Sequence, residues 1–137
     1  MNQALVVLGL VGIALSTSSI SAQEVDVQLR LISLHCIEPE DSGADEAFLV
    51  VNGNRFSVWS MNNGDTRDLR GMEAIPFDTN VRVELYDEDT PWIGDDHDLL
   101  GVATINDSES GAGESQRTFD LDEAHYRLTY VVEPRDG

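Results

Sequence analysis

Short runs in which apolar and polar residues alternate recur along this chain, and none of its segments keeps a sustained 3.6-residue period. Every second residue from Val25 to Leu31 is apolar, and the pattern then changes parity through Leu34 and Cys36, which indicates a β-bulge near Leu31. The pair Asn52-Gly53 between two such runs is typical of a tight β-hairpin. We therefore predict an all-β chain folded as a two-sheet antiparallel β-sandwich.

The same alternation predicts about eight strands, enough for one sandwich. Their expected positions are 25–36, 47–51, 55–60, 68–72, 81–86, 100–105, 115–121 and 126–132. The fourth is a weak edge strand in the least readable part of the chain. The polar segment 106–114 is expected to be a connection, and 122–125 a short turn or a single helical turn.

The first 22 residues have the features of a secretory signal peptide. Residues 4–15 are uncharged and apolar, and Ala22 supplies a small residue for cleavage. A retained membrane anchor is the alternative, but about 12 apolar residues fall short of the roughly 20 that a spanning helix needs. We therefore expect a signal peptide at 1–22, one domain at 23–137, and a secreted or periplasmic protein. Cys36, the only cysteine, allows no internal disulfide and is predicted to be buried.

The chain is strongly acidic, with a formal net charge of −18 that falls entirely on residues 23–137. Its eight basic residues are all arginines. Such a surface repels nucleic acid and anionic lipid, and it attracts cations. A salt-tolerant surface would explain acids spread evenly over the chain, but it does not explain why the acids cluster.

Eleven of the 26 acidic residues fall in two segments between predicted strands. The first acidic loop, residues 38–46, holds five of them, and the second acidic loop, residues 87–98, holds six. Four predicted strands separate the two loops, and an even number allows both to reach the same end of a sandwich. Like charges held that close repel one another unless a cation neutralises them. Because Ca²⁺ takes about six to eight oxygen ligands with irregular geometry, we predict a shared calcium site.

Both segments resemble the calcium-binding C2 domain, a β-sandwich that binds Ca²⁺ between loops at one end. Asp41-Ser42-Gly43-Ala44-Asp45-Glu46-Ala47-Phe48 is similar to its first calcium loop, and Asp87, Asp89 and Asp98-Leu99-Leu100-Gly101 are similar to its third. The resemblance implies that the Ca²⁺ ligands are Asp41, Asp45, Asp87, Asp89 and Asp98. Glu38, Asp95 and Asp96 have no counterpart in that pattern and are candidate additional ligands because they lie close to it in the sequence. Glu46 replaces the usual proline and the first-loop spacing is one residue shorter, so the number of ions stays open.

Two other metal sites fit the acidic loops less well. An EF-hand places its acids at regular positions between two helices, whereas here the flanking segments are predicted strands. His97 lies between Asp96 and Asp98, which would suit a transition metal, but oxygen ligands greatly outnumber nitrogen ligands. Calcium is therefore the predicted ion.

An apolar tip, Pro91-Trp92-Ile93, interrupts the second acidic loop. The tip either inserts into a membrane interface once Ca²⁺ has cancelled the surrounding charge, or Trp92 folds back over the end of the sandwich. Many lipid-binding C2 domains hold acidic head groups with lysines, and this chain has none. We therefore expect weak membrane contact through Trp92 and Ile93 and favour the folded-back arrangement.

The sequence has no Gly-x-Ser-x-Gly elbow, phosphate-cradling loop or zinc-protease helix. We predict an exported, non-enzymatic module whose loops bind calcium to order a binding surface, with a protein as its partner and no nucleic acid. One alternative is a structural subunit of a surface assembly or an acidic inhibitor of an exported protein. Another is a Ca²⁺-dependent membrane-docking domain. The oligomeric state stays open.

Overall fold

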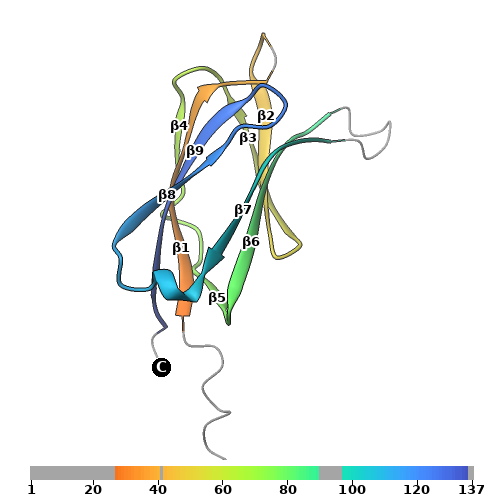
Figure 1. Cartoon of the computed structure of the whole chain (residues 1–137). Helices are drawn as coiled ribbons and strands as arrows, with labels where there is room; N and C mark the ends of the chain where they lie inside the picture. Colours follow the sequence, from red (N-terminus) through yellow and green to blue (C-terminus); the bar gives the residue numbers. More distant parts are fainter. Residues whose placement is uncertain (1–26, 41, 90–96, 136–137) are drawn as a thin grey trace, which may run out of the picture.

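The computed structural model describes residues 27–40, 42–89 and 97–135, which form two antiparallel sheets packed face to face (Figure 1). One sheet has the strand order β4-β1-β9-β8, with β5 also paired to β1, and the other has the order β3-β2-β6-β7. The elements within these ranges are β1 (Val27–Glu38), β2 (Asp45–Val51), β3 (Asn54–Met61), β4 (Thr66–Asp68), β5 (Ile75–Phe77), β6 (Asn80–Asp87), β7 (Asp98–Asn106), the 3-10 helix η3 (Asp107–Glu109), β8 (Glu114–Phe119) and β9 (His125–Pro134). No helix in these ranges has the length and hydrophobicity to cross a membrane. The predicted all-β sandwich is confirmed.

Two local predictions are also confirmed. The register between β1 and β9 shifts between Leu31 and Ser33, where the parity of the apolar residues changes. Asn52 and Gly53 join β2 to β3 with φ angles of 49° and 85°, both in the left-handed region that a type I′ hairpin turn requires. Short-range sequence patterns determine both features.

The weak strand predicted at 68–72 lies elsewhere. β4 ends at Asp68, and β5 is an additional short strand that the sequence did not reveal. The Asp68 carboxylate accepts a hydrogen bond from the backbone N–H of Arg70 (2.9 Å) and turns the chain at this point. Both β4 and β5 pair antiparallel with β1, so they run in the same direction as one interrupted strand. Together β4 and β5 carry the chain once along the length of the sandwich. The chain therefore still crosses this length four times between the two acidic loops, an even number.

The core lies between the two sheets. Alternate residues of β9 point into it, and Tyr126, Leu128, Tyr130 and Val132 are each at most 1% exposed. Cys36 pairs with Tyr126 across β1 and β9 and is fully buried, as predicted. Burial raises the pKa of the Cys36 thiol, so the thiol stays protonated at neutral pH.

A close contact joins the sheets along β7 and β8. A Cβ atom added to Gly101 would lie 2.4 Å from the Cβ of Phe119, so this position has no room for a side chain. The carbonyl of Leu100 accepts a hydrogen bond from the N–H of Leu121 (2.9 Å). These contacts hold the turn between β8 and β9 beside the beginning of β7.

Candidate metal centre

The ends of both acidic loops and the β8–β9 turn gather at one end of the sandwich, uppermost in Figure 1. The backbone N–H of Glu46 donates to Oδ1 of Asp87 (2.8 Å), and the N–H of Glu88 donates to the carbonyl of Glu46 (2.8 Å). Asp98, the first residue of β7, is the register partner of Asp87, the last residue of β6. The structure therefore brings the two acidic loops together, as the strand count predicted.

Asp45 begins β2 and is fully buried. Its carboxylate accepts the backbone N–H of Glu40 at both oxygens (3.1 Å to Oδ1 and 2.9 Å to Oδ2). The phenol of Tyr126 donates a third hydrogen bond to Oδ2 (2.6 Å). Burial and the adjacent Asp45 carboxylate raise the pKa of Tyr126, so the phenol keeps its proton and acts as the donor.

Three predicted ligands from the second acidic loop also lie together. Asp87 is 4% exposed, Asp98 is partly buried and Asp89 is exposed. One oxygen from each of the three lies within 4.8 Å of the other two. The N–H of Asp89 donates to Nδ1 of His97 (3.2 Å), so His97 binds the backbone of the second acidic loop through this nitrogen.

Glu40 and Asp122 belong to the same site, although they are absent from the predicted ligand set. One oxygen of Glu40 lies within 4.8 Å of oxygens from Asp45 and Asp87, and a second group joins Glu40 to Asp98 and Asp122. Two strands, β7 and β8, separate Asp98 from Asp122, so the even-number argument used for the acidic loops also applies to this turn. Applying that argument to every acidic turn would have found Asp122.

Carboxyl groups surround Glu40. Burial, followed by the neighbouring carboxyls of Asp122, Asp87 and Asp98, raises the pKa of Glu40 to about 9. Its Oε1 atom is buried, and no hydrogen-bond donor of the described residues reaches it. The surrounding carboxyls cannot neutralise a negative charge on Glu40. A proton or a bound cation is therefore needed to balance it.

Arginines neutralise acids elsewhere in the described ranges, but not Glu40, Asp45, Asp98 or Asp122. The described residues form five ion pairs: Arg30–Glu133, Arg55–Glu88, Arg70–Asp68, Arg82–Glu84 and Arg117–Glu109. One of these pairs, Arg55–Glu88, reaches the second acidic loop, whereas Glu40, Asp45, Asp98 and Asp122 form no ion pair with an arginine among the described residues.

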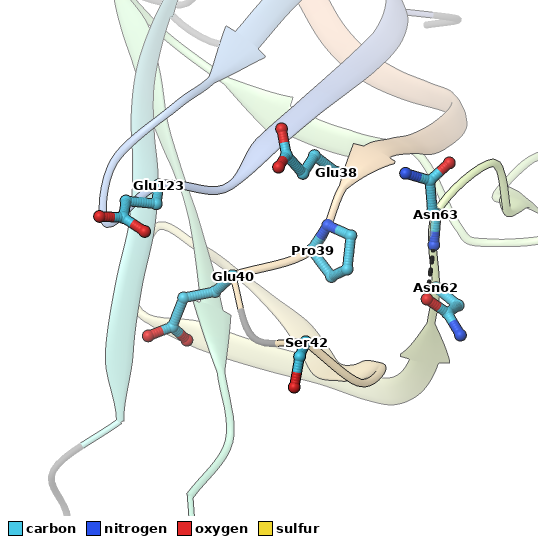
Figure 2. Close-up of a pocket in the computed structure, with 7 residues that line it drawn as sticks. All are labelled: Glu38, Pro39, Glu40, Ser42, Asn62, Asn63 and Glu123. Atoms are coloured by element: carbon cyan, nitrogen blue, oxygen red, sulfur yellow. Dashed lines mark hydrogen bonds between the residues drawn. The ribbon is translucent and has the colours of Figure 1, made fainter.

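Glu38 belongs to none of these three groups. It ends β1 and lines a neighbouring pocket of about 350 Å³ with Pro39, Glu40, Ser42, Asn62, Asn63 and Glu123. Figure 2 shows Glu40 and Glu123 on one side of this pocket and Asn62 and Asn63 on the opposite side. The predicted ligands Asp41, Asp95 and Asp96 and the tip residues Trp92 and Ile93 lie outside the described residues.

The donor atoms fit a calcium ion. All are carboxylate oxygens, the ligands that Ca²⁺ prefers. Two ligands on opposite sides of one Ca²⁺ lie about 4.8 Å apart, twice a Ca–O distance of about 2.4 Å, and the oxygens of each group meet this limit of 4.8 Å. The three groups overlap through Glu40, Asp87 and Asp98, so they form one connected cluster of carboxylates.

No protein-family model and no curated protein matches this chain. Solved structures match its fold. The paired C2 domains of extended synaptotagmin 2 align with a TM-score of 0.53 and 18% identity, over 81% of this chain and 41% of that one. Human GIVD cytosolic phospholipase A2 aligns with a TM-score of 0.51 and 14% identity, over 82% of this chain and 17% of that one.

These similarities show that the chain has a C2-like fold, which confirms the resemblance found in the sequence. The chain spans less than half the length of either matched protein. At this level of identity the comparison concerns the fold, and the function has to be argued from the site.

Proposed function

We propose that this chain is an exported, non-enzymatic module that binds Ca²⁺ at the acidic end of its sandwich, where the ion orders a binding surface for a protein partner. The observation that carries the proposal is the buried Oε1 atom of Glu40. It lies among carboxyl groups, and no hydrogen-bond donor of the described residues reaches it. A divalent cation would supply the positive charge that no arginine supplies to Glu40.

Glu40, Asp87 and Asp98 would form the centre of the proposed site because each belongs to two of the three oxygen groups. Asp89 and Asp122 would bind from the two sides, and Asp45 from beneath. On the strength of the sequence, Asp41 remains a proposed ligand, and Glu38, Asp95 and Asp96 remain proposed additional ligands. The bound ion would hold three chain segments together, which is how it would order the surface.

Thermal unfolding in Ca²⁺ and in EDTA tests the proposal. An ion that binds only the folded state stabilises it by about 2.7 kcal/mol at a hundredfold excess over Kd, so the melting temperature should rise clearly. Asp87→Asn combined with Asp89→Asn should abolish the rise. Asp78→Asn combined with Asp107→Asn removes the same charge from two exposed positions, one between β5 and β6 and one at the beginning of η3. These elements lie at the end of the sandwich opposite the acidic site (Figure 1), so the rise should stay intact.

Two salt controls separate site binding from screening, because any salt relieves repulsion in so acidic a protein. Choline chloride at matched ionic strength should give only a small shift. Mg²⁺ demands near-ideal octahedral geometry and gives up its waters reluctantly, so it should stabilise less than Ca²⁺. Equal melting curves in millimolar Ca²⁺ and in EDTA would refute the calcium function.

Export is a separate part of the proposal, based on residues 1–22. Cleavage after Ala22 would leave Gln23 as the first residue of the mature protein. The N-terminal sequence of protein recovered from the medium or periplasm checks this directly. Full-length protein retained inside the cell would contradict it.

One observation favours membrane docking as a second candidate function. Leu121 is 45% exposed, and it lies beside Asp122 in the β8–β9 turn at the acidic end. Liposome sedimentation with and without Ca²⁺ tests this candidate. Trp92→Ala and Leu121→Ala should each reduce the pelleted fraction, and unchanged pelleting in both variants would remove these residues from the function.

A further inference from the structure

Tyr126 connects the core of the sandwich to the acidic end. It lies on β9, its side chain is fully buried, and its phenol reaches Asp45 at the beginning of β2 in the opposite sheet. The distance from the phenol oxygen to Oδ2 of Asp45 is 2.6 Å, which is typical of a charge-assisted hydrogen bond. This bond joins the two sheets directly beneath the acidic loops.

Asp45 in turn holds the backbone of the first acidic loop at Glu40. Both of its oxygens accept the backbone N–H of Glu40, so Glu40 is held five residues before Asp45 in a closed loop. Tyr126 thereby helps to hold an acidic cluster together, against the mutual repulsion of Glu40, Asp45 and Asp87. A carboxylate offers about four lone-pair sites, so Asp45 can accept these bonds and still face an ion.

We propose that Tyr126 is a positioning residue for the calcium site: its phenol holds Asp45, and through Asp45 the backbone of Glu40, in the binding geometry before any ion arrives. This inference rests on the proposed calcium function. Without the phenol, the ion has to order the first acidic loop as it binds, and that cost lowers affinity. Tyr126 itself does not touch the ion.

The chain contains a matched control for this inference. Tyr130 lies on the same strand and face, is equally buried, and donates a hydrogen bond to Glu109. Glu109 ends η3 at the opposite end of the sandwich (Figure 1). Tyr126→Phe and Tyr130→Phe therefore remove the same atom from the same kind of contact, and only the first change reaches the acidic end.

Calcium titration by calorimetry of the wild type and both variants is the first measurement. We expect Tyr126→Phe to weaken Ca²⁺ binding about tenfold, the loss typical of a hydrogen bond to a charged group, and Tyr130→Phe to leave the affinity within about twofold of the wild type. Equal affinities for the two variants would overturn the inference while leaving the calcium function intact.

Amide hydrogen exchange in EDTA is the second measurement, and it needs no calcium. The N–H of Glu40 should exchange faster in Tyr126→Phe than in the wild type or Tyr130→Phe, since Asp45 holds that N–H. Unchanged exchange would overturn the positioning role. If the wild type binds no calcium, the proposed function fails, and the exchange rates still decide whether Tyr126 holds the loop.

Discussion

The two ends of the sandwich contain the same kind of contact but balance its charge differently. At each end a buried tyrosine of β9 donates to a carboxylate, Tyr126 to Asp45 and Tyr130 to Glu109. Glu109 also accepts hydrogen bonds from Arg117 (2.8 Å) and from the N–H of Asn106 (2.9 Å). Burial alone would raise the pKa of Glu109, but these three donors lower it.

The acidic end shows the opposite balance. Burial and three neighbouring carboxyls raise the pKa of Glu40, and no arginine of the described residues pairs with it. A buried or half-buried acid is therefore tolerated in this fold when hydrogen-bond donors from the chain surround it. Where the chain supplies acids in their place, the balance has to come from a proton or from a bound cation.

The largest expected effect concerns the contact that places β7 and the β8–β9 turn at the acidic end. Gly101→Ala would put a Cβ atom 2.4 Å from the Cβ and 2.6 Å from the Cα of Phe119. Because the backbone of β8 has to move, we expect a loss of about 3 kcal/mol in the free energy of unfolding and a smaller Ca²⁺ response. Chemical denaturation in EDTA and in Ca²⁺ measures both.

Gly71→Ala is the control for this change, because an added Cβ at Gly71 meets nothing within 4 Å. It should alter stability by less than about 0.5 kcal/mol. Equal stabilities of Gly101→Ala and Gly71→Ala would mean that β7 and β8 can separate freely.

The pH dependence of the ion-free protein should show the charge imbalance directly. The pKa of Glu40 is raised from 4.5 to about 9, so between these values the folded state holds a proton that the unfolded state has lost. The ion-free protein therefore loses stability as pH rises through this window. Glu40→Gln should flatten the dependence, which melting curves in EDTA at several pH values would measure; parallel curves for the two proteins would contradict the placement of Glu40.

At the opposite end, removing the Arg117 guanidinium should lower stability without changing the response to calcium. Arg117→Met leaves the half-buried Glu109 carboxylate with two donors from the chain instead of three. We expect it to lower the free energy of unfolding by about 1–2 kcal/mol, with the Ca²⁺-induced rise in melting temperature unchanged. Glu109→Gln in the same background should restore part of the loss. A reduced Ca²⁺ response in Arg117→Met would show that the two ends are coupled.

The smallest expected effect concerns the arginine beside the second acidic loop. The Arg55 guanidinium lies 3.8 Å from the centre of the Phe48 ring and pairs with Glu88. Arg55→Met should cost about 0.5–1 kcal/mol, mostly through the lost cation–π contact. Arg82→Met, which breaks the pair between the exposed Arg82 and the partly buried Glu84, is the control without a cation–π contact and should change stability less. Equal losses would assign the effect to charge alone.

Features that depend on neighbours along the chain could be predicted from the sequence. The alternation of apolar residues specified the strands, the parity change located the bulge of β1, and Asn52-Gly53 specified the hairpin turn. The clustering of acids and the spacing from Asp87 to Gly101 carried the C2 resemblance, because those residues lie within two short segments. The even number of predicted strands allowed the two acidic loops to lie at one end, and this holds in the structure because β4 and β5 run in the same direction in place of one predicted strand.

The groups that complete the site depend on how the two sheets pack against each other. Tyr126 and Asp45 are 81 residues apart, and nothing in the alternation of β9 distinguishes Tyr126 from the other buried residues of that strand. Asp122 joins the site because β7 and β8 return the chain to the acidic end, and the partly buried Glu40 lies there among carboxyls from other segments. A local pattern states which face of a strand is buried, whereas the partners of a buried polar group are set by how the two sheets pack.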